Sequence, residues 1–242
     1  MDIEITHPQD KEGVITNIYP RKNQMLRPKV SNIDQSILVF SVTNPPINFD
    51  LLDRLTILSE EQNLDIIIVF NKIDLISEIP RDIKTLYESI GYKTIFTSIE
   101  TGQGIAELEN NLKNKVSVFC GASGVGKSSL VNSICPRANM EVGVVSAKGK
   151  RGKHTTRYSN LVPFKGGYIV DSPGFTSLFF NFEPLALANY FKEFRPFLDN
   201  CRFPNCSHIS EPDCGIKEVL GMEISENRYE RYKSLYRELI RS

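Results

Sequence analysis

Tryptophan is absent from this chain of 242 residues, and only three histidines and five cysteines are present. Three of the cysteines share one short segment with a histidine, which does not fit an extracellular disulfide framework and favours a metal site. No apolar run reaches the length of a membrane span, and the acidic start Met1-Asp2-Ile3-Glu4 is unlike a signal peptide. We therefore expect a cytoplasmic protein with no membrane partner.

Net charge is absent as well, because 29 Lys and Arg residues balance 29 Asp and Glu residues, so overall charge identifies no partner. Hydrophobic content of 40% and charged content of 24% are typical of globular proteins and allow a buried core. Positive charge is concentrated locally instead. Half of residues 148–157 are Lys or Arg, and a second basic stretch spans residues 21–29.

Apolar strands alternate with amphipathic helices through most of the chain. We expect strands at 37–42, 66–70, 93–97, 116–120, 161–164 and 168–170, and helices at 49–63, 81–90, 104–113 and 127–134. This alternation predicts a mostly parallel sheet with helices on both faces. Before it we expect only the strand 13–18. After residue 182 we expect a helical aromatic segment, the cysteine cluster and a final helix with an apolar face, which favours core packing over a partner surface.

A complete phosphate-binding loop, G-x-x-x-x-G-K-[ST], occupies residues 121–128. Its glycines let backbone N–H groups turn inward around phosphate oxygens, and the expected helix after it favours an anion at its N-terminus. Lys127 is expected to contact the β- and γ-phosphates and Ser128 to bind Mg²⁺. A structural glycine-rich turn is the alternative. The expected nucleotide contacts in this loop are Gly121, Ala122, Ser123, Gly124, Val125, Gly126, Lys127, Ser128 and Ser129.

A candidate guanine-reading motif, Asn71-Lys72-Ile73-Asp74, follows the expected strand 66–70. The Asp74 carboxylate can accept two hydrogen bonds from the N1–H and 2-amino groups of guanine, whereas adenine offers no such pair of donors. Ser98 lies in Thr97-Ser98-Ile99, which resembles the second base-contacting loop. In ordinary GTPases the base motif follows the phosphate loop, but here it precedes it. Either one match is accidental or the domain is circularly permuted.

A third element, Asp171-Ser172-Pro173-Gly174, matches D-x-x-G, in which the Asp holds Mg²⁺ through water and the Gly N–H senses the γ-phosphate. Thr155 and Thr156 lie between this motif and the phosphate loop, where a GTPase supplies a threonine to Mg²⁺ from a switch loop. Thr156, Asp171 and Gly174 are therefore candidate catalytic residues. Ser128 and Thr156 are the candidate magnesium ligands, with GTP and GDP as the nucleotides.

The cysteine cluster, Cys201-x4-Cys206-x-His208-x5-Cys214, supplies three thiolates and an imidazole, which matches a closed tetrahedral zinc site. Four protein ligands leave no position for water, so we expect one structural Zn²⁺ per chain, which folds a segment with little core of its own. Reduced cysteines without metal are the alternative. Cys120 and Cys135 stand singly and are expected to be packing residues.

Taken in this order, the motifs resemble those of circularly permuted GTPases, and most closely the ribosome small-subunit-dependent GTPase A family. Further matching stretches are Pro20-Arg21-Lys22-Asn23, Arg27-Pro28, Ser31-Asn32-Ile33-Asp34-Gln35, Leu51-Leu52-Asp53-Arg54 and Arg151-Gly152-Lys153-His154-Thr155-Thr156. The resemblance extends from residue 13 onward. In the family, the cysteine segment also binds zinc.

The resemblance implies three parts: a partial OB-fold remnant and linker at 1–33, a circularly permuted GTPase domain at 34–182, and a helical zinc-binding domain at 183–242. The family carries a complete N-terminal OB-fold, of which only the last strand and its exit are recognisable here. The chain is therefore either naturally short or a piece of a longer protein.

Phe175 follows D-x-x-G, where Ras-like proteins carry the glutamine that orients the attacking water. An aromatic ring cannot position that water, so slow unaided hydrolysis is expected. His154 is the candidate to position it once the switch loop orders, and contact with RNA or phosphate is the alternative role. The basic segment 148–157 is expected to contact ribosomal RNA, and a solvated switch loop is its alternative.

The resemblance implies a GTP hydrolase that acts as a late assembly factor of the small ribosomal subunit, contacts its rRNA and is stimulated by it. The alternative is a GTP-gated rRNA-binding module with negligible turnover, which Phe175 and the shortened OB region favour. An ATP-dependent RNA enzyme is disfavoured by Asp74. Nothing in the sequence demands a dimer, so a monomer is expected.

Overall fold

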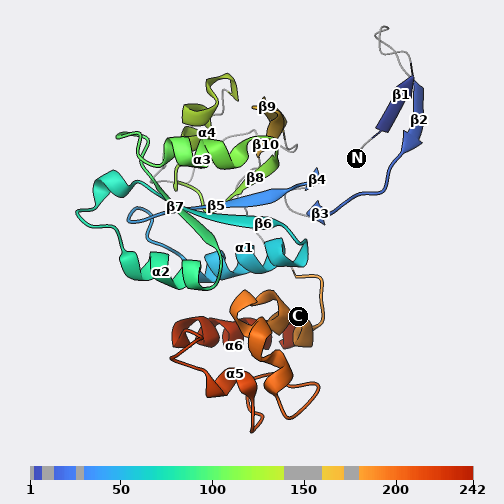
Figure 1. The fold of residues 1–242 in the computed structure, drawn as a ribbon, viewed down its shortest axis with the longest axis vertical. Coiled ribbons are helices and arrows are strands. Elements are labelled where there is room, and N and C mark those ends of the chain that lie inside the picture. The colour runs from blue at the N-terminus through green and yellow to red at the C-terminus, as the bar shows by residue number, and fades with distance from the viewer. Residues whose placement is uncertain (1–2, 7–13, 26–29, 139–159, 172–179, 242) are drawn as a thin grey trace.

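The computed structural model describes residues 3–6, 14–25, 30–138, 160–171 and 180–241. A six-stranded sheet in the order β7-β6-β5-β8-β10-β9 forms the centre of the molecule (Figure 1). Its strands are β5 (Gln35–Ser41), β6 (Asp65–Asn71), β7 (Lys93–Thr97), β8 (Val116–Cys120), β9 (Asn160–Phe164) and β10 (Gly167–Asp171). All neighbours are parallel except the antiparallel pair β9 and β10. The predicted mostly parallel sheet is confirmed.

Two layers of helices cover the sheet (Figure 1). On one face lie α1 (Phe49–Glu61) and α2 (Arg81–Ser89), and on the other α3 (Ile105–Leu112) and α4 (Lys127–Ile134). Alternate residues of the central strand β5 enter opposite layers: Leu38 and Phe40 pack under α1, whereas Ile37 and Val39 pack with α3 and α4. A strand buried on both faces must be apolar throughout, which explains the uninterrupted run Ile-Leu-Val-Phe.

The strand order places the phosphate loop between the two halves of the sheet. The strand that enters the loop, β8, pairs with β5 on one side and β10 on the other. Because β5, β6, β7, β8 and β10 run in parallel, the loops after all five strands lie at one edge of the sheet. A base motif that precedes the phosphate loop in sequence therefore reaches the same edge in space.

The N-terminal region contains more strands than the sequence predicted. A hairpin of β1 (Ile3–Thr6) and β2 (Val14–Ile18) lies apart from the main sheet, and β3 (Gln24–Met25) pairs with β4 (Val30–Ser31) (Figure 1). Only β2 was expected, because two-residue strands carry no alternation that a sequence can reveal. Asn23, just before β3, holds the segment between β4 and β5 through hydrogen bonds with both the N–H (2.9 Å) and the carbonyl (2.7 Å) of Ile33.

The C-terminal unit (residues 180–241) has its own apolar cluster. It consists of the 3-10 helices η3 (Pro184–Tyr190) and η4 (Lys192–Asn200), the short α5 (Gly215–Glu218) and the long α6 (Glu226–Arg241). The cluster includes Leu187, Phe191, Phe194, Ile216, Tyr229, Tyr232, Leu235 and Tyr236. The prediction that the aromatic face of the terminal helix is core is therefore confirmed. Among the helices in the described ranges, none combines the length and apolarity needed to cross a bilayer.

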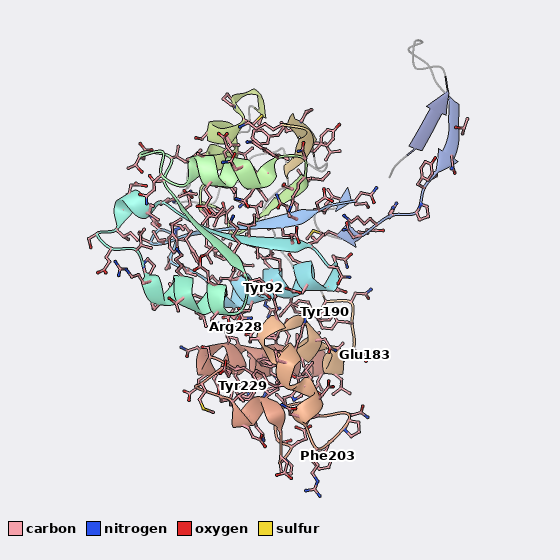
Figure 2. The ribbon with its side chains drawn as sticks, in the orientation of Figure 1. Tyr92, Glu183, Tyr190, Phe203, Arg228 and Tyr229 are labelled. Atoms are coloured by element: carbon pink, nitrogen blue, oxygen red, sulfur yellow. The ribbon has the colours of Figure 1, made fainter. Side chains whose placement is uncertain are left out.

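A buried ion cluster joins this unit to α1. The Arg228 guanidinium, 1% exposed, donates to Asp53 Oδ1 at 2.5 Å and to Glu193 Oε2 at 3.1 Å. Arg231 pairs with the other oxygen of Asp53, so two cations face two carboxylates. The Arg228 guanidinium carbon also lies 5.6 Å from the Tyr87 ring centroid and 5.2 Å from that of Phe191. Figure 2 shows Arg228 at this boundary.

Candidate nucleotide site and metal centre

The phosphate loop connects β8 to α4, and close approach of its neighbours requires glycine at two positions. Gly121 has φ +147°, and a Cβ there would lie 2.1 Å from the Val39 carbonyl oxygen of β5. Gly126 has φ +95°, and a Cβ there would lie 2.5 Å from Asn71 Nδ2. Any side chain at these positions would push the loop away from β5 or β6.

Lys127, the first residue of α4, folds back over the loop. Its Nζ donates to the carbonyl oxygens of Gly121 (2.8 Å) and Ala122 (2.6 Å). Ser128 and Ser129 follow half-buried in the first helical turn. The ammonium group, the helix N-terminus and the serine hydroxyls thus gather at the loop, which is an arrangement suited to a phosphate chain and its magnesium ion.

Asn71 ties the base motif to the phosphate loop. Its buried amide donates through Nδ2 to the Val125 carbonyl at 3.0 Å and accepts through Oδ1 from the Thr97 hydroxyl at 3.0 Å. Lys72, at φ 66°, adds a second connection: its Nζ donates to the carbonyls of Gly124 (2.7 Å) and Asn44 (2.5 Å). The two motifs that the sequence separates are therefore linked directly by hydrogen bonds.

Asp74 is exposed, as a residue that reads a ligand must be. Ser98, which is fully buried at the end of β7, donates its hydroxyl to Asp74 Oδ1 at 2.5 Å. The Ser98 hydroxyl oxygen also accepts from the Thr101 N–H at 3.2 Å, which fixes the direction of its own proton. The role that the structure supports for Ser98 is therefore to orient the Asp74 carboxylate.

A hollow of about 630 Å³ borders the phosphate loop and was not anticipated. Ala122, Ser123 and Val125 form one wall, residues 45–50 a second, and Arg231 of α6 contributes from the C-terminal unit. The Arg231 guanidinium carbon lies 5.4 Å from the centroid of the Phe49 ring. Sequence reasoning missed Arg231 because a lone arginine in a polar helix face carries no signal for a distant loop.

The predicted catalytic residues His154, Thr156 and Gly174 lie outside the described residues, and so do Thr155 and Phe175. Asp171 is described only as the backbone end of β10, where it pairs with Asn160. Since β10 runs parallel to β8, Asp171 ends at the same sheet edge as the phosphate loop. This position agrees with the expected D-x-x-G location without defining the carboxylate.

The structure gathers the four predicted metal ligands. The donor atoms of Cys201, Cys206, His208 and Cys214 all lie within 4.8 Å of one another. The Sγ atoms of Cys201 and Cys214 are 3.9 Å apart, and each is 3.4 Å from His208 Nδ1. Tetrahedral Zn–S bonds of about 2.3 Å place neighbouring sulfurs about 3.8 Å apart. The group can therefore hold a metal ion with little rearrangement.

Residues outside the ligand set hold the ligand loop. The Glu211 carboxylate accepts from the backbone N–H groups of Ser207 (2.8 Å), Ile209 (3.2 Å) and Ser210 (3.1 Å). Burial raises the pKa of Glu211, but hydrogen bonds from Ser207 and Ile209 outweigh it and lower the pKa to about 2. The Tyr229 hydroxyl donates to the His208 carbonyl at 2.6 Å, which ties the loop to α6.

Burial also affects the thiols, because it raises the pKa of Cys206 and of Cys214. A thiolate in such surroundings needs a cation, and a divalent metal would supply it by displacing the proton. Cys120 and Cys135 are separate from this cluster: each is buried in one of the two apolar layers of the sheet. Their predicted role as packing residues is confirmed.

The strand order and the joined motifs define a class: a phosphate-loop GTPase fold that is circularly permuted. Comparison with known proteins agrees. The model of the RsgA GTPase family matches residues 18–181, and the chain belongs to this family.

Two curated relatives of this chain carry the same name. The chain is 44% identical to the small ribosomal subunit biogenesis GTPase RsgA of Agathobacter rectalis, over 99% of this chain and 80% of the relative. It is 42% identical to the protein of the same name from Thermotoga maritima, over 98% of this chain and 82% of the relative.

Solved structures show the same fold. The crystal structure of YjeQ from Thermotoga maritima superposes with a TM-score of 0.83 at 40% identity, covering 98% of this chain and 82% of that one. YloQ, described as a circularly permuted GTPase, gives 0.80 at 33% identity, covering 98% and 78%. The predicted circular permutation is confirmed, and neither motif match is accidental.

Proposed function

We propose that this chain hydrolyses GTP and acts in the biogenesis of the small ribosomal subunit, as the names of its relatives state for them. One observation carries the nucleotide part of the proposal: Asn71 and Lys72 bind the carbonyls of Val125 and Gly124, so the base motif and phosphate loop form one site. A single nucleotide can then contact Asp74 at its base and Lys127 at its phosphates.

The roles within this site follow from the side chains. Asp74 selects guanine, and Ser98 orients the Asp74 carboxylate. Lys127 and the N–H groups of residues 121–129 hold the phosphates. Mg²⁺, which neutralises phosphate charge when bound, would be held by Ser128 and Thr156, with Asp171 acting through water and Gly174 sensing the γ-phosphate. His154 positions the attacking water, since Phe175 cannot.

The Cys201, Cys206, His208 and Cys214 group fits one structural Zn²⁺, because three sulfurs and one nitrogen are preferred zinc donors and four protein ligands close the site. We assign residues 1–33 to an OB-fold remnant and linker, 34–182 to the GTPase domain and 183–242 to the zinc-binding domain. The protein works as a cytoplasmic monomer whose partners are GTP, GDP and the small subunit with its rRNA.

The test is GTP and ATP turnover with and without purified small ribosomal subunits. We expect turnover of GTP but not ATP, with at least a tenfold rise on adding subunits, which corresponds to about 1.4 kcal/mol of barrier. Asp74→Asn should lose the preference for GTP, whereas Glu78→Gln, a nearby exposed carboxylate change, should keep it. GTP binding without measurable turnover under either condition would instead support the GTP-gated rRNA-binding module.

A further inference from the structure

A second hollow, of about 450 Å³, opens at the edge of the sheet opposite the phosphate loop. Residues at the start of β6 and β7 and just before β8 line it, among them Asp65, Lys93 and Lys115. Lys192 and Arg195 of η4 line it from the C-terminal unit. The hollow thus lies between the two units, away from the nucleotide motifs.

Four cations converge there from three parts of the chain: Lys93 of β7, Lys115 just before β8, and Lys192 and Arg195 of η4. Lys115 pairs with Asp65 at 2.9 Å, Lys93 with Glu107 at 3.6 Å, and Arg195 with Glu60 at 2.6 Å, while Lys192 donates to the Gly91 carbonyl. Only two of these carboxylates, Glu60 and Asp65, line the hollow, so its lining carries an excess of positive charge. The lysine side chains remain 46% (Lys93) and 39% (Lys115) exposed, and such surface pairs rearrange at little cost.

Two buried polar atoms in the lining lack a partner. Gln35 is fully buried; its Nε2 donates to the Asn111 carbonyl (2.9 Å) and the Ser117 hydroxyl (2.8 Å), but Oε1 has no hydrogen-bond partner among the described residues. The hydroxyl of Tyr92, 3% exposed, is the second such atom (Figure 2). Both atoms are buried beneath the surface of the lining, so the exposed lysines are the groups of this hollow that a ligand can reach.

We propose that this hollow binds the sugar-phosphate backbone of ribosomal RNA in the small subunit, an inference that rests on the proposed function. Phosphate oxygens accept from the exposed ammonium groups of Lys93 and Lys115. Contacts of this kind fix the position of an RNA backbone without reading its sequence.

Lys93→Gln/Lys115→Gln tests the proposal, because the released partners Glu107 and Asp65 are themselves more than half exposed and stay solvated. The matched control is Lys84→Gln/Lys233→Gln, which removes two ion-paired lysines of α2 and α6. Binding to purified small subunits is measured over a salt series with a GTP analogue present. Each lost phosphate contact lowers the salt slope by about 0.7–0.9, so the test variant should lose about 1.4–1.8 in slope and bind about tenfold more weakly.

Wild-type protein and control should bind alike, and GTP turnover without subunits should be the same in all three. Acylation of lysine amines gives an independent readout: subunits should protect Lys93 and Lys115 in the wild-type protein but leave Lys84 reactive. A test variant that binds like the control, or unprotected Lys93 and Lys115, overturns the proposal. A second GTP molecule bound per chain and lost in the test variant would also overturn it, in favour of a free nucleotide. If wild-type protein neither binds subunits nor responds to them, the proposed function falls as well.

Discussion

The GTPase domain and the C-terminal unit are stabilised in different ways. In the first, β5, β6 and β8 are buried between two helical layers, and apolar contacts extend along whole strands. In the second, the described residues 180–241 form two 3-10 helices and two α-helices, held together by mostly tilted aromatic contacts and the Arg228 ion cluster. The Cys201, Cys206, His208 and Cys214 group, which could hold a metal ion, lies in the same unit. One depends on many distributed contacts and the other on a few specific ones.

This difference affects the two hollows, because the C-terminal unit, which depends on fewer contacts, supplies side chains to both of them. Arg231 borders the hollow beside the phosphate loop, and Lys192 and Arg195 border the hollow at the opposite edge. A change in the position of the C-terminal unit would therefore alter both surfaces without altering the sheet. If the specific contacts are removed one at a time, the C-terminal unit should lose stability while the GTPase domain keeps it.

Loss of the metal should have the largest effect. With Cys206→Ser, or after chelation, the C-terminal unit should lose its structure, because metal binding in such small sites contributes about 10 kcal/mol or more to folding. Hydrogen exchange should show α5 and α6 unprotected while β5, β6 and β8 stay protected. Cys135→Ser, a change in the apolar layer around α4, should leave α6 protected. Equal loss of protection in both units would show that the GTPase domain and the C-terminal unit are not stabilised in different ways.

Breaking the buried ion cluster should come next. Arg228→Ala leaves the buried Glu193 carboxylate without its cation and Asp53 with Arg231 alone, which should cost about 3–5 kcal/mol in the free energy of unfolding. Arg54→Ala removes a more exposed pair with Glu238 and should cost about 1 kcal/mol or less. Urea denaturation measures both, and similar costs for the two variants would show that burial does not matter here.

Within the GTPase domain, Asn71→Ala should act locally. It leaves the Val125 carbonyl and the Thr97 hydroxyl without their partner, at about 1–3 kcal/mol for each buried group. We expect weaker GTP binding by calorimetry, because one of the two side chains that hold the phosphate loop near β6 is lost and only Lys72 remains, and we expect unchanged metal content. Asn132→Ala, on the helix after the loop, is the comparison variant. Full GTP affinity in Asn71→Ala would show that the hydrogen bonds of Asn71 between the two motifs do not support GTP binding.

The smallest effect concerns Asp34, at the entry to β5. Burial raises its pKa, but hydrogen bonds from the Val116 N–H and from Lys22, together with the Lys22 charge, outweigh this and lower it below its ordinary 3.8. Its stabilisation is therefore complete above pH 3.8 and is lost as pH falls through the lower folded-state pKa. Asp34→Asn should cost about 1 kcal/mol or less at pH 7, since the side chain is partly exposed. The difference from wild-type protein in thermal unfolding should shrink below pH 3.8, and a difference that stays constant with pH would contradict this.

Local pattern predicted the regular elements of the sheet well. The predicted bounds of β7, β8 and α4 match the structure, because each is a strongly apolar or periodic run with a glycine or turn at its end. The pattern missed β1, β3 and β4, which are short or depend on a partner strand, and it did not distinguish the 3-10 turns of η3 and η4 from α-helix. Pro196 lies inside η4, where it has no N–H for an α-helical hydrogen bond, whereas Pro184 is the first residue of η3, a position that tolerates proline.

Short stretches of the sequence predict the chemistry of this protein: a phosphate-loop motif, a carboxylate in the candidate guanine-reading motif and four zinc-type donors. Which distant groups meet depends on the tertiary structure. Asp53 and Arg228, 175 positions apart, share a buried ion cluster, and Asn71 joins a loop 54 positions away. The reason is physical: local sequence sets a side chain's functional groups and its element, whereas a charge or amide finds its partner only through the packing of elements, which no short pattern encodes.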